Sequence, residues 1–211
     1  MYVIAMAAQK GGVGKTTIAG HLGVEAERQK FGQVALVDTD PQASLTAWWD
    51  VRAADTPAIA KVQIDNLKAD LKKLQTSGFD LVIIDTPPAL TEHIVKVIQM
   101  ADLVLIPSQP SPVDLRALGT TVDLVEALKK PMVFLLNRAT PRTRIAASAV
   151  MALSEHGTVA PVQIHSRIDF AYSFTNGQTV QELDANGASA KEITKLWDYL
   201  TKKLHKVRAA A

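Results

Sequence analysis

The residues with the clearest chemical potential lie near the start of the chain, in the stretch KGGVGKTT at 10–17. Glycine has no Cβ, so backbone N–H groups in such a stretch can turn inward around an anion. Lys15 stands where a lysine reaches the β and γ phosphates of a nucleotide, and the Thr16 hydroxyl stands where it ligates magnesium. We therefore predict a phosphate-binding loop whose nucleotide-binding residues are Gly11, Gly12, Val13, Gly14, Lys15, Thr16 and Thr17.

This loop departs from the strict spacing Gly-x-x-x-x-Gly-Lys-Ser/Thr at its first residue, where Gln9 stands in place of glycine. It also carries a second lysine, Lys10, which a loop for one nucleotide does not need. Its surroundings suit the motif, because residues 2–8 form an apolar run typical of a buried strand and residues 16–30 have apolar side chains at helical spacing. Phosphates bound here would lie at a helix N-terminus, where free N–H groups and the helix dipole favour negative charge.

Three aspartates follow the loop in an order that suits a magnesium site. Asp38 and Asp40 lie in DTDPQASL, at the end of the apolar run 33–38, and Asp85 begins DTPP at the end of the run 81–85. A carboxylate at the end of an apolar strand near such a loop can hold magnesium through its water ligands, and Asp85 fits this role. Any one of the three alone could instead be a helix cap or a turn former. Three in order behind a Gly-Lys-Thr loop favour metal and nucleotide chemistry.

The elements that must position these residues are apolar, β-branched runs separated by segments with helical periodicity. The runs are 2–8, 33–38, 81–85, 102–107 and 131–137. They predict an α/β fold with a mostly parallel, twisted sheet, helices on both faces and right-handed crossovers. Ligands in such sheets bind beyond the carboxyl ends of the strands. The weakly patterned segment at 54–61 is interpreted as a surface excursion within one domain, residues 1–211.

Composition excludes several classes of protein. The 211 residues include no cysteine, so disulfides and thiolate metal sites are excluded and nothing indicates export. The chain begins directly in a strand, and its apolar runs are far shorter than the ~20 residues of a membrane span, so we expect a cytoplasmic protein. Net charge is only +2, but residues 138–211 hold 10 basic against 6 acidic residues, which makes the C-terminal third the basic part.

The three motifs KGGVGKTT, DTDPQ and DTPP together resemble the deviant Walker A family of ParA partition ATPases and MinD cell-division ATPases, and DTDPQ is closer to the ParA pattern. The resemblance continues in QPSPVDLRAL at 109–118 and in RIDFAYSFTNGQTVQEL at 167–183, so it covers nearly the whole length. It implies a P-loop NTPase fold that binds ATP and Mg2+. The chain resembles the short ParA proteins, because it starts at the strand of the loop and leaves no room for an N-terminal helix-turn-helix domain.

The resemblance also implies roles for individual residues. In this family two subunits sandwich two nucleotides face to face as a homodimer, and the lysine matching Lys10 reaches across to the partner's phosphates. By the same match Lys15 acts on the bound nucleotide, Asp40 positions the attacking water, Asp38 supports the magnesium shell and Asp85 is the Walker B carboxylate. A slow basal ATPase that a partner stimulates is the implied behaviour, since phosphoryl transfer needs mostly positioning and charge stabilisation.

The choice of base can be examined at the end of the run 131–137. GTPases of this architecture often end a late strand with Asn-Lys-x-Asp, whose carboxylate accepts hydrogen bonds from guanine. Here the corresponding residues are Asn137, Arg138, Ala139 and Thr140, none of which has a carboxylate, so adenine is favoured over guanine. Asn137 either pairs with the adenine edge or caps the helix that follows.

The first of two functional readings is a ParA-like ATPase whose ATP-bound dimer binds DNA without sequence preference and associates with the nucleoid. A ParB-like or cargo adaptor protein would stimulate hydrolysis and carry the plasmid, chromosome or protein complex to be positioned. Sequence-independent binding needs only clustered cations, although any one of them could simply belong to a solvated helix face. Arg144 and Arg167 are the preferred contacts, among the candidates Arg142, Arg144, Arg167, Lys191, Lys195, Lys202, Lys203, Lys206 and Arg208.

The second reading is a MinD-like ATPase that attaches to membranes through an amphipathic C-terminal helix. The stretch 191–207 places apolar residues on one face opposite lysines, namely Ile193, Leu196, Trp197, Leu200, Leu204 and Val207. Such a stripe is more often a terminal helix packed on the core, and the tail ends in RAAA without a bulky apolar anchor. The ParA-like reading is therefore preferred, and membrane binding is not expected.

Two adjacent tryptophans, Trp48 and Trp49, follow the DTDPQ loop on a predicted helix. Neighbouring residues cannot both face the core from one helix, so one of them is expected to be exposed or to lie at a dimer or partner interface. The alternative is that it is buried against a neighbouring helix.

Overall fold

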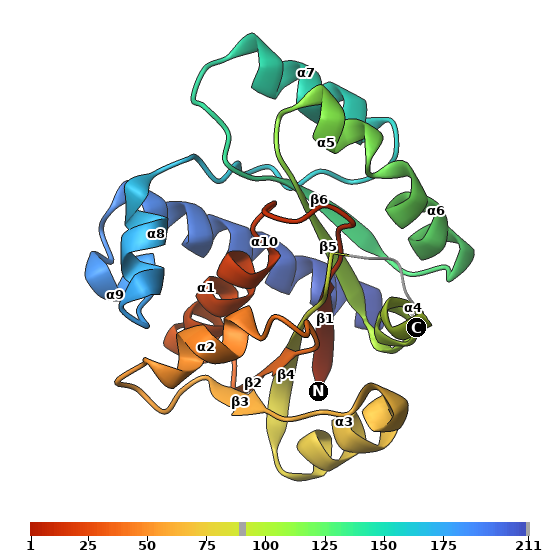
Figure 1. Ribbon diagram of the computed structural model, residues 1–211, viewed down its shortest axis with the longest axis vertical. Helices are drawn as coiled ribbons and strands as arrows, with labels where there is room; N and C mark the ends of the chain where they lie inside the picture. The colour runs from red at the N-terminus through yellow and green to blue at the C-terminus, as the bar shows by residue number, and fades with distance from the viewer. Residues whose placement is uncertain (89–91, 210–211) are drawn as a thin grey trace.

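The computed structural model describes residues 1–88 and 92–209, and its strands form one six-stranded sheet. The order is β3-β2-β4-β1-β5-β6, and every pair of neighbouring strands is parallel. Figure 1 shows this sheet at the centre of the molecule, with helices around it. The predicted α/β class is confirmed. The strands are β1 (Tyr2–Met6), β2 (Gln33–Asp38), β3 (Ala58–Ala60), β4 (Phe79–Asp85), β5 (Leu103–Ser108) and β6 (Met132–Leu136).

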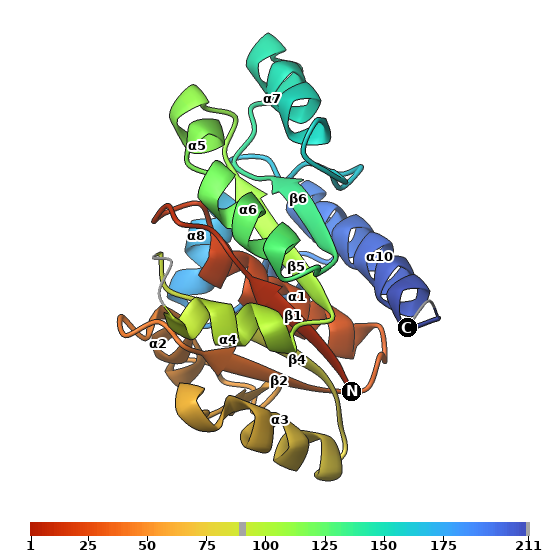
Figure 2. The same cartoon turned by 90° about the vertical axis from the view of Figure 1, so that its right-hand side faces the viewer.

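The helices pack in two layers, one on each face of the sheet (Figure 2). One layer contains α1 (Lys15–Arg28), α2 (Ser44–Asp50), α8 (Ile168–Thr175), α9 (Val180–Leu183) and α10 (Ala188–Ala209). The other contains the 3-10 turn η1 (Ile64–Asn66), α3 (Leu67–Thr76), α4 (Glu92–Met100), α5 (Pro112–Arg116), α6 (Gly119–Ala127) and α7 (Arg144–Ser154).

The strand β1 shows why its sequence is apolar without a break. Ile4 and Met6 belong to the hydrophobic cluster under α1 and α10, whereas Val3 and Ala5 belong to the cluster on the opposite face. Successive side chains of a strand point to opposite faces, and here both faces are covered. The same arrangement in β2, β4, β5 and β6 accounts for the runs from which the sheet was predicted.

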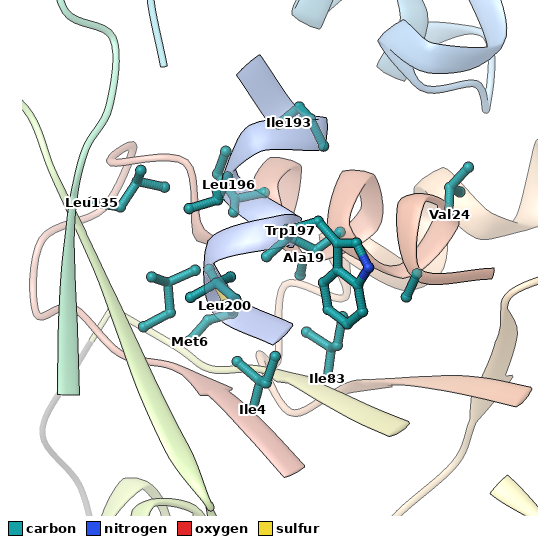
Figure 3. Close-up of a cluster of buried hydrophobic side chains, with 14 of the residues drawn as sticks. Ile4, Met6, Ala19, Val24, Ile83, Leu135, Ile193, Leu196, Trp197 and Leu200 are labelled. Atoms are coloured by element: carbon teal, nitrogen blue, oxygen red, sulfur yellow. The ribbon is translucent and has the colours of Figure 1, made fainter. Parts of the chain in front are cut away.

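The C-terminal helix α10 lies across the sheet beside α1 and is held by its apolar stripe. Figure 3 shows Leu196, Trp197 and Leu200 of α10 in one cluster with side chains of the sheet, where Leu200 lies beside Met6 and Trp197 lies beside Ile83. Ile193 and Leu204 are buried in the same cluster. These side chains are part of the core, so the MinD-like reading of α10 as a membrane anchor is not supported.

Two further findings bear on whether the chain contacts a membrane. Within residues 1–88 and 92–209, no helix is long and apolar enough to cross a membrane. The last two residues of the RAAA tail, 210 and 211, lie outside the described residues.

The segment 54–61 differs from its prediction. Residues 58–60 form the edge strand β3, which pairs in parallel with β2 through Ala58, Ile59 and Ala60. A strand of three residues, two of them alanine, has too little apolar alternation to be recognised, and its pairing with β2 decides its conformation.

Neither of the two tryptophans is fully exposed, so that part of the expectation is wrong, and a dimer or partner contact by Trp49 stays a prediction. Trp48 is buried and stacks on Phe174 of α8, with ring centroids 4.9 Å apart. Trp49 is half-buried on another side of α2, where its Nε1 donates a hydrogen bond to the Pro57 carbonyl at 2.7 Å. Both can be covered because α8 packs against one side of α2 and the chain leading to β3 covers another.

A buried histidine joins α1 to the C-terminal segment. His21 Nδ1 donates to the Thr17 carbonyl at 2.7 Å, and His21 Nε2 accepts from the Val180 N–H at 3.2 Å. The rings of Phe170 and Phe174 lie 5.2 and 5.8 Å from the imidazole. Burial lowers the pKa of His21 to about 4, because the charged form has lost its water. The side chain is therefore neutral at pH 7.

This pKa predicts how His21 contributes to stability. The unfolded chain binds a proton near pH 6.5 and the native chain only near pH 4, so the contribution is present above pH 6.5 and is lost as pH falls towards 4. His21→Asn keeps a donor towards Thr17 and removes the titration. The difference in free energy of unfolding between wild type and His21→Asn, measured in urea, should shrink by up to about 3 kcal/mol between pH 7 and pH 4. Parallel pH profiles for the two proteins would contradict the buried neutral imidazole.

Candidate functional site

The predicted site residues converge because all strands run in one direction and end at the same edge of the sheet. The glycine loop follows β1, and the strands on either side of β1 are β4 and β5. Asp38 ends β2 and Asp85 ends β4, and the two residues are direct register partners. The loop at 10–17 and the acidic motifs that begin at Asp38 and Asp85 are therefore neighbours in space, although they are far apart in the sequence.

The phosphate-binding loop is braced from two later strands. Gln109, which follows β5, donates from Nε2 to the Gly12 carbonyl at 3.0 Å, and Asn137, which follows β6, donates from Nδ2 to the Val13 carbonyl at 2.6 Å. Gly14, at φ 96°, begins α1 as its N-cap, in a conformation that favours glycine. Among hydrogen bonds between described residues, none is donated by the N–H groups of 11–14. Side chains therefore bind the carbonyls of Gly12 and Val13, whereas the N–H groups of 11–14 are available to bind an anion.

This geometry corrects one interpretation of Asn137 and adds Gln109 to the residues of the site. The alternative role of Asn137 as a cap of the following helix is wrong, because α7 begins at Arg144 and its N-cap is Thr143, whose Oγ1 accepts from the Ala146 N–H at 3.4 Å. Gln109 was missed as a site residue. Its signals were a side-chain amide directly after an apolar strand, the same position that Asn137 has after β6, and its place at the start of the family-like segment 109–118.

The two lysines of the loop have separate partners. Lys15 is buried and its Nζ donates at 3.2 Å to the carbonyl of Ala8, which follows β1. Burial lowers the pKa of Lys15, and the nearby carboxylates of Asp85 and Asp40 oppose this shift. Lys10 instead forms an ion pair with Asp114 of α5, with 2.9 Å between Nζ and Oδ2.

Thr16 and Asp85 form a pair that suits magnesium. The Thr16 hydroxyl donates to Asp85 Oδ2 at 2.6 Å, and Asp85 Oδ1 is buried without a hydrogen-bond partner among the described residues. Burial raises the pKa of Asp85 to about 7, and the negative charges of Asp38 and Asp40 add to this rise. An unpartnered, acceptor-only oxygen beside a hydroxyl is a fitting ligand set for Mg2+, which binds proteins through one or two oxygens and completes its shell with phosphates and water. Thr16 and Asp85 would hold the ion, with Asp38 close by.

The aspartates of the DTDPQ motif shape the loop between β2 and α2. Asp38 accepts from the Asp40 N–H at 3.1 Å through Oδ1 and from the Thr46 N–H at 2.9 Å through Oδ2. Asp40 accepts from the Gln42 N–H at 2.9 Å through Oδ1. Asp38 is not the N-cap of α2, which is Ala43, but its carboxylate shapes the turn and ties the loop to the first turn of α2 while remaining beside Asp85.

A cavity of about 790 Å³ opens beside the loop, between α1, α2, α8 and the segment 165–168. Its wall combines polar groups with aromatic rings and includes Thr17, Trp48, Asn137, Ser166, Arg167 and Phe170. The volume and the mixed lining are those of a small-molecule site. Its position next to Gly14 and Thr17 suits the nucleoside part of a nucleotide.

The structure does not bring the preferred DNA contacts together. Arg167 is half-buried, and its Nη1 lies 2.7 Å from Glu192 Oε2, whose other oxygen accepts from His165 Nδ1 at 2.6 Å. Arg144 is exposed at the first residue of α7, on the face of the sheet opposite α10. Lys191 and Lys195 are exposed on α10.

The glycine loop, the buried Lys15 and the Thr16–Asp85 pair at the ends of parallel strands define a P-loop nucleotide-binding protein. The comparisons with known proteins agree. A family model described as the CobQ/CobB/MinD/ParA nucleotide binding domain matches residues 4–180. The chain belongs to this family.

Individual relatives support the same assignment. The Maintenance of carboxysome distribution protein A of Halothiobacillus neapolitanus is 31% identical over 202 residues, which cover 90% of this chain and 92% of the relative. The apo structure of McdA from Cyanothece has a TM-score of 0.78 at 21% identity and covers 97% of this chain and 99% of that one. MinD from Pyrococcus horikoshii OT3, complexed with Mg-ADP, has a TM-score of 0.80 at 17% identity, with 98% of each chain covered. These two structures share the fold.

The raised pKa of Asp85 makes a prediction for Asp85→Asn. The native carboxyl takes up its proton near pH 7 and the unfolded one near 3.8, so the stabilisation present at low pH is lost as pH rises through 7. Without nucleotide, Asp85→Asn should therefore be more stable than wild type at pH 8 by about 2–4 kcal/mol, and this advantage should vanish towards pH 4. Urea unfolding measures both, with the exposed Asp123→Asn as the control that shows no such trend. The same variant should lose magnesium-dependent nucleotide binding, and a variant that is less stable than wild type at pH 8 would contradict the buried charge.

Proposed function

We propose that this protein is a one-domain, ParA-like ATPase that binds ATP and Mg2+ and positions a cargo. The observation that carries this proposal is the loop braced by Gln109 and Asn137, with Lys15 inside it and the unpartnered Asp85 oxygen at its edge. Membership of the CobQ/CobB/MinD/ParA family supports it. The name of the Halothiobacillus relative, which concerns carboxysome distribution, favours a large protein assembly as the cargo.

Hydrolysis requires a water to attack the γ-phosphorus while the bond to the β,γ-bridging oxygen breaks, giving ADP and phosphate. Asp40 positions this water, because its Oδ2 makes no hydrogen bond to a described residue and its carboxylate lies close enough to act on Lys15 and Asp85. Lys15 leaves the Ala8 carbonyl for the phosphates and, with the N–H groups of 11–17, offsets their charge. Mg2+, when bound, supplies further neutralisation of the phosphate oxygens.

Adenine is the preferred base. Asn137 lines the cavity, and because its Nδ2 is bound to the Val13 carbonyl, its Oδ1 is the atom available to accept from the adenine amino group. The segment 165–168, held to α10 through Glu192, also lines this cavity.

The ATP-bound form is a homodimer in which Lys10 of each subunit reaches the partner's phosphates. Two nucleotides facing one another bring many negative charges together, and a cation that crosses between subunits offsets this repulsion. Such a dimer forms only when nucleotide is present, so its lifetime reports the state of the nucleotide.

The dimer binds DNA through phosphate contacts, acts in the cytoplasm on the nucleoid, and is released when a cargo-bound adaptor stimulates hydrolysis. The best-placed cations are four exposed lysines of α10 at helical spacing, which form one stripe: Lys191, Lys195, Lys202 and Lys206. Arg144 offers a second contact on α7, whereas Arg167 is already paired with Glu192 and contributes mainly to the cavity wall. Backbone contacts of this kind need no sequence readout.

The central test measures binding to random-sequence DNA and to anionic liposomes without nucleotide, with ADP and with a slowly hydrolysed ATP analogue. Wild type should bind DNA only with the analogue, Lys10→Ala should lose this binding, and neither should bind liposomes. Flotation with liposomes and no affinity for DNA would contradict the proposal. Release of phosphate should be absent in Asp40→Ala, although that variant should still bind ATP.

Charge reversal identifies the DNA contacts. Lys191→Glu with Lys195→Glu should weaken DNA binding by about tenfold or more and reduce its salt dependence, because counterion release falls with each lost phosphate contact. The matched control reverses Lys68 and Lys72, two exposed lysines on α3, which should change DNA binding little. Equal losses in both variants, measured by fluorescence anisotropy across a salt series, would show that net charge and not the α10 stripe is responsible.

A further inference from the structure

The segment 109–120 holds the start of the phosphate-binding loop through three side-chain contacts. Gln109 binds the Gly12 carbonyl, Thr120 Oγ1 donates to Gln9 Oε1 at 2.7 Å, and Asp114 binds Lys10. Two of these contacts are between neutral groups. Only the contact between Lys10 and Asp114 joins opposite charges. Lys10 is also the lysine that a loop binding one nucleotide does not need.

Asp114 is unusual because it is a buried carboxylate with little compensation. Its side chain is 3% exposed, whereas that of Lys10 is 41% exposed. Lys10 is its only charged partner among the described residues, and Asp114 Oδ1 has no hydrogen-bond partner there. A buried carboxylate that loses its one cation is left uncompensated in a medium that solvates it poorly. Asp114 therefore opposes any movement that takes Lys10 away.

We propose that Asp114 is a positioning residue that holds Lys10 within its own subunit, and that this ion pair must open before Lys10 can reach the phosphates of a second copy. This inference rests on the proposed ATP-dependent dimer. Transfer of the ammonium from Asp114 to phosphates exchanges one anionic partner for another and leaves Asp114 unpaired. The pair therefore raises the nucleotide concentration at which dimers form and keeps the nucleotide-free chain monomeric.

Asp114→Asn tests this role with little change in shape. The substitution keeps the side-chain volume and the backbone contact from the Asp114 N–H to Ser111 Oγ, and it removes the charge that retains Lys10. The concentration of slowly hydrolysed ATP analogue needed for half-maximal dimerisation, measured with Mg2+ by analytical ultracentrifugation, should fall about five- to tenfold. Thr120→Val, which removes the neutral contact to Gln9, is the matched control and should not lower it.

A double-mutant cycle on the nucleotide-free chain tests the ion pair separately. Lys10→Ala should lower the melting temperature, because Asp114 is left unpaired, and the same change should have little effect in an Asp114→Asn background. Equal effects of Lys10→Ala in both backgrounds would overturn the ion pair and the proposal with it.

The outcomes separate this role from the dimer itself. A wild-type chain that stays monomeric at saturating analogue would overturn the proposed dimer and, with it, this role of Asp114. A wild-type dimer that Asp114→Asn weakens, while the variant melts like wild type, would overturn only the retention of Lys10 and would show that Asp114 supports Lys10 in the dimer. A lower analogue requirement in Asp114→Asn alone would establish the proposal.

Discussion

The site depends on one constraint, the central place of β1 in a sheet whose strands are all parallel. With β4 and β5 on its two sides, the loop that leaves β1 emerges between the end of β4, which carries Asp85, and the segment after β5, which carries Gln109 and Asp114. In an antiparallel sheet these strand ends would alternate between two edges. The parallel arrangement of the strands therefore determines the position of every side chain in this site.

Around that loop the chain keeps several charges away from water, and each is held differently. Asp85 has a hydroxyl partner and one unpartnered oxygen, Lys15 donates to a backbone carbonyl, and Asp114 is paired with the more exposed Lys10. Buried groups that are only partly satisfied are costly in isolation and favourable once a complementary charge arrives. A magnesium nucleotide would bring both a cation for Asp85 and phosphates for the lysines, so the cost of burying these groups and the affinity for such a ligand have a common origin.

The C-terminal part of the chain completes the molecule in two ways. The apolar side of α10 is core, whereas its outer side carries exposed lysines. Between these two sides, Glu192 fixes His165 and Arg167 at the wall of the cavity, and His21 links α1 to the start of α9. The helix that carries the cations is thus connected through side chains to the nucleotide cavity and to the helix that follows the phosphate-binding loop.

The sequence by itself determined the α/β class, the five longer strands, the phosphate-binding loop and the aspartates at its edge. These features are local, because a run of apolar residues, a cluster of glycines or a carboxylate at a strand end has the same meaning wherever the strand is placed. The family resemblance was carried by the same short motifs and is confirmed by the family match.

The tertiary structure decided what depends on distant partners. Gln109, Asp114 and Thr120 reach the loop from about 100 residues away, and no pattern within 109–120 shows that they do so. The burial of Trp48, the partial burial of Trp49 and the pairing of β3 with β2 likewise depend on which segment packs alongside. The same holds for the ion pair that engages Arg167 with Glu192. A residue's type and its neighbours in sequence set its local conformation, whereas its partners and its exposure are properties of the packed chain.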